Sequence, residues 1–371
     1  MPRLHLYPVG NADTTVVELD NDRVIIFDYS HTKDSEDEND KKIDLKKELT
    51  EFLDSKNLKE IDVAVFTHAD LDHIRGSDNF FYFEHAKQYQ DEHRIKIKEI
   101  WVPASFIVEE NLTGEARIIR QEARHRLKEN SGIRVFSNPI FLKTWFEDND
   151  IDPKSREHLI SDAGSVVPGF NLQNDKVEFF PHSPFAHKVG EDLESRNEGS
   201  LVLHLTFEVD GRKTRVMMAA DTTYNRLQDI IRISKYHNND ARLETDIYHI
   251  SHHCSYTALE EEKSKEKCSP PDDIDDHFRN GSNSGCILVS PSKVIEDEVS
   301  VQPPHIQAAR YYREVASNNR GEFLVTMEFP SKKKPDVMVI DITGQGGKVR
   351  KSIISGAMTA AGSASPRMGN G

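Results

Sequence analysis

Residues 61–73 read Ile61-Asp62-Val63-Ala64-Val65-Phe66-Thr67-His68-Ala69-Asp70-Leu71-Asp72-His73, and no other run of the chain says more about its fold. The first six residues are mostly apolar and β-branched, which predicts a buried strand. This strand leads directly into four side chains that can bind metal, at positions 68, 70, 72 and 73. Imidazole and carboxylate groups suit zinc, manganese or iron. A rigid strand that ends in such a loop is typical of an enzyme that holds two divalent cations close together.

The order His-x-Asp-x-Asp-His resembles the metal loop of the metallo-β-lactamase fold. Within that superfamily it is most similar to the soluble domain of ComEC-type competence proteins, where an aspartate also replaces the second histidine of the usual His-x-His-x-Asp-His. The resemblance implies that His68, Asp70, Asp72 and His73 bind two divalent metal ions, zinc or manganese. It also implies an α/β fold, the metallo-β-lactamase-like αββα four-layer sandwich.

Two later elements extend this resemblance. Asp221 follows an apolar strand, at the place where the family's carboxylate spans both cations. His252 and His253 resemble the family's Gly-His-His-Gly-Ser element, with Ser251 and Cys254 in place of the two glycines. One imidazole can bind metal, and the other can donate a proton or contact the substrate. We place His252 on the metal and His253 near the leaving group, and the opposite assignment stays open.

Residues 197–200 resemble the Asn-Asn-x-Ser that stands in ComEC-type domains instead of a third histidine ligand. The resemblance implies that Asn197 and Ser200 contact the substrate or metal-bound water. Asn197, the neighbouring Glu198 or water can complete the first metal site. A turn with Asn and Gly is the alternative reading of this segment.

The N-terminal part carries two more elements of the resemblance. Asp13 closes a Val-Gly-Asn-Ala-Asp turn, and Asp28 ends an apolar strand. Both are expected near the metal edge, where a carboxylate can orient ligand histidines from a second shell. Near the C-terminus, Gln302 stands where the family usually has a histidine before a proline, and His305 lies three residues later. A substrate contact at this position is therefore in doubt.

Apolar periodicity predicts strands, then a helix, strands, a helical middle, and again strands, a helix and strands. This order suits two sheets packed face to face with helices outside. We expect one hydrolase domain over 1–351 with insertions at about 105–175 and 258–284, and a disordered tail over 352–371. More locally, the predictions are a helix over 115–129, irregular structure over 138–170, a hairpin turning at Asp210-Gly211, a charged surface insertion over 258–284 and a closing strand pair at 323–327 and 336–342.

The composition limits the function classes. The 371 residues include 48 basic and 63 acidic side chains, a formal charge of −15, which argues against broad nucleic-acid binding. Three separate cysteines do not make a disulfide framework and indicate reduced thiols. No stretch approaches the roughly 20 apolar residues that span a bilayer, and the N-terminus lacks a signal-peptide layout. We expect a cytoplasmic protein without a membrane partner.

These features predict a metal-dependent hydrolase, most specifically a phosphodiesterase or nuclease that uses a metal-bound hydroxide as the nucleophile. Asp72 and His253 are its expected catalytic residues. Single-stranded nucleic acid or a small phosphodiester is the expected substrate. The Arg-rich segment 117–128 and Lys332–Lys334 can supply phosphate contacts, and the alternative for them is a solvated helix face and a charged hairpin loop. Partner proteins of a bacterial DNA-processing or defence module are a further expectation. The alternatives are an ester, lactone or amide hydrolase on the same metals, and a metal-binding regulatory or interaction module.

Overall fold

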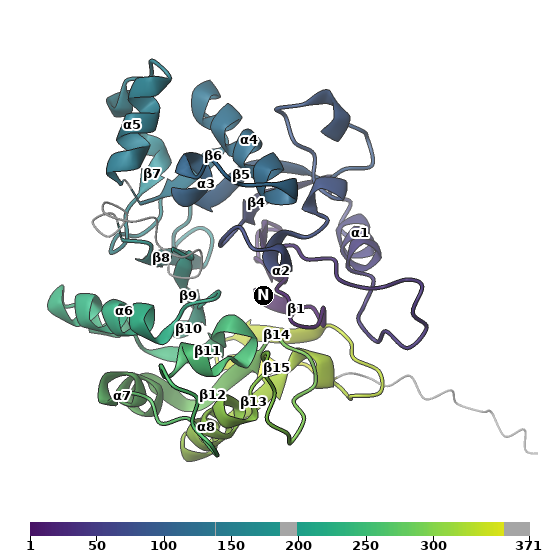
Figure 1. The fold of residues 1–371 in the computed structure, drawn as a ribbon, viewed down its shortest axis with the longest axis vertical. Helices are drawn as coiled ribbons and strands as arrows, with labels where there is room; N and C mark the ends of the chain where they lie inside the picture. Colours follow the sequence, from purple (N-terminus) through teal and green to yellow (C-terminus); the bar gives the residue numbers. More distant parts are fainter. Residues whose placement is uncertain (138, 186–198, 352–371) are drawn as a thin grey trace, which may run out of the picture.

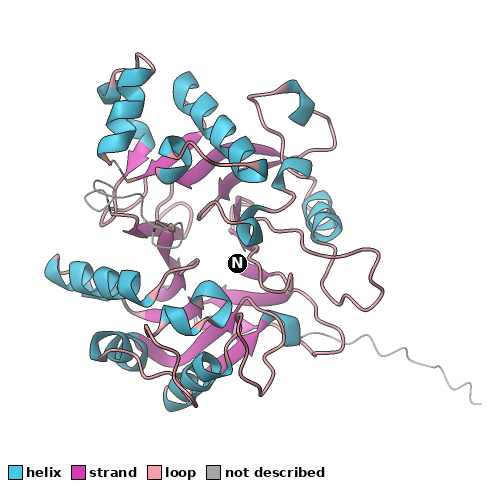
Figure 2. Ribbon diagram, in the orientation of Figure 1, coloured by secondary structure: helices cyan, strands magenta, loops and turns pink. Residues whose placement is uncertain are grey.

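The computed structural model describes residues 1–137, 139–185 and 199–351. The expected disordered tail, 352–371, lies outside the described residues. Within them the strands form two sheets, which are stacked between two groups of helices (Figures 1 and 2).

The first sheet contains nine described strands. In spatial order they are β15 (Gly346–Val349), β14 (Met338–Thr343), β1 (Arg3–Leu6), β2 (Thr15–Glu18), β3 (Val24–Phe27), β4 (Glu60–Val65), β5 (Lys96–Pro103), β6 (Ile133–Phe136) and β7 (Ile160–Ser161). The strands from β15 to β3 are antiparallel, and those from β3 to β7 are parallel.

The second sheet has six described strands. They are β13 (Glu322–Val325), β12 (Ser282–Ser290), β11 (Thr245–His249), β10 (Arg212–Met218), β9 (Val202–Val209) and β8 (Val177–Ser183). The strands β8, β9 and β10 are antiparallel, which confirms the hairpin predicted at Asp210-Gly211. The strands from β10 to β13 run parallel.

Helices cover the outer face of each sheet (Figure 1). On the first sheet lie α1 (Leu45–Ser55), α3 (Ser105–Val108), α4 (Gly114–Glu129) and α5 (Ile140–Asp148). On the second lie α6 (Tyr224–Tyr236), α7 (Asp272–Gly281) and α8 (Ile306–Asn318). The short helix α2 (Leu71–Ile74) lies inside the predicted metal loop.

Three separate hydrophobic clusters confirm the four layers. One packs the first sheet against its helices, a second fills the space between the sheets, and a third packs the second sheet against its helices. Strand β3 shows the alternation, because Val24 and Ile26 face the first cluster while Ile25 and Phe27 face the second. A strand buried on both faces is continuously apolar, as this one is. The architecture is therefore the αββα sandwich that the sequence predicts.

Three local predictions were wrong. The two C-terminal strands are not a pair, since β13 joins β12 in the second sheet and β14 joins β1 in the first. The region 138–170 is not all irregular, because α5 and β7 lie there. The segment 258–284 is not a simple surface insertion, because α7 buries Ile274 and Phe278 in the third cluster. Acidic residues on the exposed side of α7 hide its apolar stripe from a reading of composition.

Two general predictions can be compared with the structure. The three cysteines are buried and free of disulfides. Among the described residues, no helix combines the length and the apolar character that crossing a membrane requires.

Candidate metal centre

The predicted site residues lie at the carboxyl ends of parallel strands in both sheets. In the first sheet, Asp28 follows β3 and the metal loop follows β4. In the second, Asp221 follows β10, and the pair at 252–253 follows β11. Pairing aligns these ends, because Phe27 is in register with Val65 and Met218 with His249. Packing one sheet on the other brings the two sets of loops together at one edge, the usual place for a site in such sheets.

Asp221 lies at the centre of this edge, and its two carboxylate oxygens face different side chains. Oδ1 lies 3.1 Å from His73 Nε2 and 3.9 Å from His253 Nε2. Oδ2 lies 3.8 Å from His68 Nε2 and 3.8 Å from His252 Nε2. The carboxylate is buried, so it is shared between two imidazole pairs rather than solvated.

The two aspartates of the metal loop extend these two sets. Asp70 Oδ2 is 3.9 Å from His68 Nε2, on the Oδ2 side of Asp221. Asp72 Oδ2 is 3.1 Å from His253 Nε2, on the Oδ1 side. The arrangement therefore has two halves that share one carboxylate.

Hydrogen bonds fix the ring orientation of the histidines. His73 Nδ1 lies 2.7 Å from Asp28 Oδ2, and Asp28 also accepts from the backbone N–H and the hydroxyl of Thr67. His253 Nδ1 lies 2.9 Å from the carbonyl of Pro291, which can only accept. In both rings Nδ1 thus carries a proton, and Nε2 is the atom that faces the site and can bind a cation once it gives up its own proton. Such partners behind the ring are typical of metal-binding histidines.

The charges in the site are strongly coupled. Burial disfavours the charged form of His73, but Asp221 and Asp28 raise its pKa well above the usual value. Burial acts in the same way on His253, and the surrounding carboxylates, Asp221 first among them, raise its pKa to about 9. Burial opposes ionisation of Asp72, yet the hydrogen bond from His253 holds its pKa at about 2. In these side chains protons occupy the positions at which a cation would compensate the carboxylates.

Several buried polar atoms fit a bound cation. Within the described part of the chain, His68 Nε2 and both carboxylate oxygens of Asp13 are buried without a hydrogen-bond partner. Leaving such atoms unsatisfied costs free energy, so each needs a ligand or an explanation. Asp13, His73, Asp221 and His253 each offer one atom, and these four atoms all lie within 4.8 Å of one another. The donor set suits a divalent cation.

One side of the site is buried, and the other side is accessible to solvent. His68, His73, His253 and Asp221 are buried, whereas the side chains of Asp70, Asp72 and His252 are 35%, 38% and 25% exposed. These three partly exposed groups form the solvent-facing rim of the site.

The backbone at the site is strained. Among non-glycine residues, Asp28, Ala220, His252, His253 and Cys254 have left-handed conformations, with φ between 46° and 63°. Such values cost of the order of 1 kcal/mol or more for each residue and persist where the surrounding structure enforces them. Cys254 stands where the resembling family has a glycine, which would adopt this conformation without strain. All five residues lie in the loops that carry Asp28, Asp221 and the histidine pair.

The structure places the predicted substrate contacts unequally. Asn197 lies outside the described residues. Ser200 is buried beside the metal loop, because the N–H of its neighbour Leu201 donates to the carbonyl of Thr67. His305 instead joins two loops: its Nδ1 accepts from the N–H of Tyr256, and its Nε2 lies 3.3 Å from the carbonyl of Val301. His305 therefore has a structural role.

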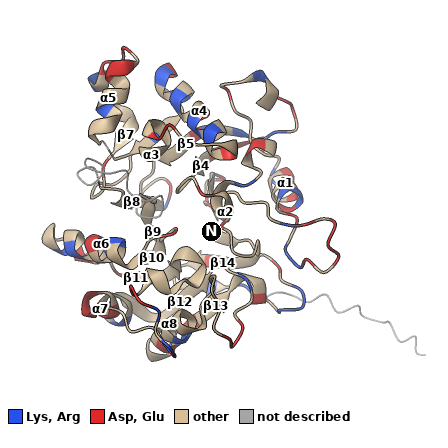
Figure 3. Cartoon of the chain, in the orientation of Figure 1, with Lys and Arg blue, Asp and Glu red and all other residues tan. Residues whose placement is uncertain are grey.

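The expectation that the Arg-rich segment contacts phosphate was wrong for most of its side chains. Figure 3 shows basic residues along α4, but three of them hold the fold together. Arg120 donates to the carbonyls of Glu109 and Glu110, and Arg124 donates to that of Ile107. Arg126 is buried and ion-paired to a glutamate of its own helix. The expectation for Lys332–Lys334 stays a prediction; these lysines lie in an exposed loop.

Sequence reasoning missed His249, the last residue of β11. It is 4% exposed, and its Nε2 lies 3.1 Å from Asp13 Oδ1. A histidine inside the predicted strand 246–251, three residues before His252, was the available signal. Its partner is 236 positions away in the chain, so only the fold brings them together.

No protein-family profile matches the sequence, and no curated protein is similar to it. One solved structure with a similar arrangement is described as a new diphosphatase from the PhnP family. The two chains are 10% identical, and the alignment covers 78% of this chain and 86% of the other, with a TM-score of 0.31. A similarity this low carries neither fold nor activity, so both rest on the residues described above.

Proposed function

We propose that this chain is a metal-dependent hydrolase of phosphodiesters with a binuclear metal centre. The observation that carries the proposal is the division of Asp221, whose two oxygens face two different sets of histidine and aspartate side chains. One set contains His68, Asp70 and His252, and the other contains Asp72, His73 and His253. When bound, two divalent cations lower the pKa of water and polarise the oxygen under attack.

The chain's own residues have distinct roles in this proposal. Asp28 and the carbonyl of Pro291 hold His73 and His253 with Nε2 toward the site. The geometry supports His253 as a ligand, the opposite of the first assignment. His252 is more exposed, and its Nδ1 lies 3.2 Å from the hydroxyl of Thr257. His252 is then the more exposed ligand of the set that also contains His68 and Asp70.

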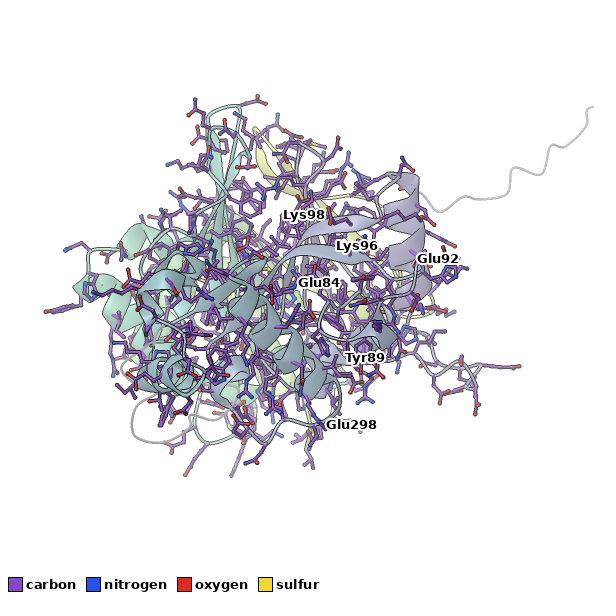
Figure 4. The ribbon with its side chains drawn as sticks, turned by 90° about the horizontal axis from the view of Figure 1, so that it is seen from above. Glu84, Tyr89, Glu92, Lys96, Lys98 and Glu298 are labelled. Atoms are coloured by element: carbon purple, nitrogen blue, oxygen red, sulfur yellow. The ribbon has the colours of Figure 1, made fainter. Side chains whose placement is uncertain are left out.

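A small phosphodiester or a single strand suits the rim better than a long nucleic-acid duplex does. Lys293 is exposed and sits between two loops of the site: its N–H donates to Asn11, and Pro291, two residues earlier, accepts from His253. It can contact one phosphate. Lys96 and Lys98 lie at the amino end of β5, the end opposite to the site (Figure 4). A single basic contact of this kind favours a small phosphodiester or a single strand as the substrate.

The test compares substrate classes under defined metals. The purified protein would be incubated with bis(p-nitrophenyl) phosphate, p-nitrophenyl acetate, and end-labelled single-stranded DNA and RNA, each with Mn²⁺, Zn²⁺, Mg²⁺ or EDTA. Metal-dependent cleavage of phosphodiesters that is lost in Asp72→Ala is expected. Cleavage of the carbon ester alone would contradict the phosphodiesterase assignment and favour the esterase alternative. A metal-loaded protein that cleaves none of them would favour the regulatory module.

A further inference from the structure

Asp13 occupies a position that an orienting role does not explain. Its side chain is 6% exposed, and its N–H donates to the carbonyl of Asp72 at 3.0 Å, which fastens the turn 10–13 to the metal loop. A carboxylate that orients a ligand histidine lies behind the ring, as Asp28 does at Nδ1 of His73. Asp13 Oδ2 lies instead 3.6 Å from His73 Nε2, on the side of the ring that faces Asp221.

The same carboxylate is short of hydrogen bonds. Oδ2 lies 3.9 Å from His253 Nδ1, a nitrogen already engaged by the carbonyl of Pro291 at 2.9 Å. Oδ1 lies 3.1 Å from His249 Nε2, within reach of that ring's N–H, whereas Oδ2 has no hydrogen-bond partner among the described residues. A buried charged carboxylate in this state is costly unless a cation accompanies it.

We propose that Asp13 is a ligand of the cation held by His73 and His253, and that His249 is the residue that positions it. This inference rests on the proposed metal centre and adds a ligand to it. Atoms that bind one cation at about 2.1 Å lie no more than about 4 Å apart, and the four atoms contributed by Asp13, His73, Asp221 and His253 need only a small contraction from 4.8 Å.

The extra carboxylate has a consequence for metal choice. With Asp72, this half of the site offers three carboxylates and two imidazoles. Zinc is usually four-coordinate and favours nitrogen and sulfur, whereas manganese accepts more oxygen ligands. The half-site of His73 and His253 is therefore expected to prefer Mn²⁺ over Zn²⁺, and to lose that preference when Asp13 is neutralised.

His249 positions this carboxylate through Nε2. Its Nδ1 is buried and has no hydrogen-bond partner among the described residues, so the contact with Asp13 is its polar anchor. It lines a cavity of about 10 Å³ together with Asp13, Asp28 and Thr67. A cavity of this size admits about one water molecule.

The test follows binding of Co²⁺ by its visible absorption, which reports ligand number and type without turnover. The full chain is expected to bind two Co²⁺. Asp13→Asn should lower the affinity for one of the two Co²⁺ ions by roughly tenfold or more and change the absorption band of that ion. His249→Phe should shift the same band, and His249→Gln, whose amide can still donate, should largely restore it. The matched control is Asp246→Asn, a buried aspartate at the other end of β11 that binds Arg212.

An unchanged Co²⁺ spectrum and affinity in Asp13→Asn would overturn the inference while leaving the metal centre intact. A chain that binds no Co²⁺ would instead overturn the proposed function itself. If Asp13→Asn does not fold, a crystal structure of the natural chain with Co²⁺ decides the question. An Asp13 oxygen at about 2.1 Å from the ion would support the inference, and one beyond about 3 Å would refute it.

Discussion

Single residues at this site are held by partners that sequence alone does not place. Asp28 was expected to orient a ligand histidine, and the structure identifies its partners, since it accepts twice from Thr67 and contacts the ring of His73. The motif predicted which side chains gather, because each follows an apolar strand. It did not predict that His253, rather than His252, lies in the buried group, since that depends on three successive left-handed residues.

We predict that Asp28→Asn weakens metal binding by about 10- to 100-fold, since it removes the charge that orients and polarises His73. Titration calorimetry with Mn²⁺ measures the change. Asp62→Asn is the matched control, because Asp62 lies on β4 and caps the N–H of Val24 at 2.9 Å, away from the site. Equal affinities in the natural chain and Asp28→Asn would contradict this role.

The pKa values predict how metal binding depends on pH. A cation must displace a proton from His253, whose pKa is raised to about 9. Below that pH the proton on His253 competes with the cation, and so does the proton on His73, whose pKa is also raised, so affinity should rise as the pH increases from 7 to 9. Binding at pH 7 should also release protons, which titrations in buffers of different ionisation enthalpy detect. Affinity that is flat between pH 7 and pH 9 would be inconsistent with a cation on this ring.

At the scale of elements, periodicity predicted most strands and the helix α1, because their apolar residues repeat regularly, and composition predicted α4. Sequence reasoning missed α7, where charge dominates composition. It predicted β13 and β14 as strands but paired them with each other, whereas they belong to different sheets. Helix α4 shows a further limit. Its arginines look like a basic surface, but Arg120 and Arg126 are buried and donate to backbone carbonyls.

Helix α4 depends on a buried ion pair. Glu122 is fully buried, lies 2.7 Å from Arg126 Nε, and accepts from the N–H of His85. We predict that Glu122→Ala lowers the free energy of unfolding by about 3 kcal/mol, because it leaves a buried arginine without its partner. Urea denaturation measures this change, and the exposed Glu129→Ala on the same helix should change it little.

The same pair has a pH signature. Burial opposes ionisation of Glu122, but His85 and Arg126 lower its pKa to about 2, against 4.5 in an unfolded chain. A carboxyl group whose pKa is lower in the folded chain than in the unfolded chain stabilises the fold at pH values above the unfolded pKa. This contribution to stability is lost as the pH falls from about 4.5 toward 2. The difference in the free energy of unfolding between the natural chain and Glu122→Ala should therefore become smaller as the pH falls over that range. A difference that stays constant would argue against an ionised Glu122.

At the scale of the whole molecule, the site exists only because two sheets stack. Asp28 and the metal loop come from the first sheet, and Asp221 and His253 come from the second. Neither sheet alone holds both halves of the proposed centre. The sequence predicted this sandwich from the order of its elements, whereas the pairing of Asp13 with His249 required the stacked structure.

The central claim is a centre of two cations that share Asp221, and the stoichiometry of Mn²⁺ binding tests it most directly. Calorimetry and elemental analysis of the natural chain should give two equivalents, and Asp221→Asn should lose at least one, because an amide offers a single oxygen ligand. The account would be contradicted if the natural chain bound fewer than two equivalents of Mn²⁺, or if Asp221→Asn bound two equivalents as the natural chain does.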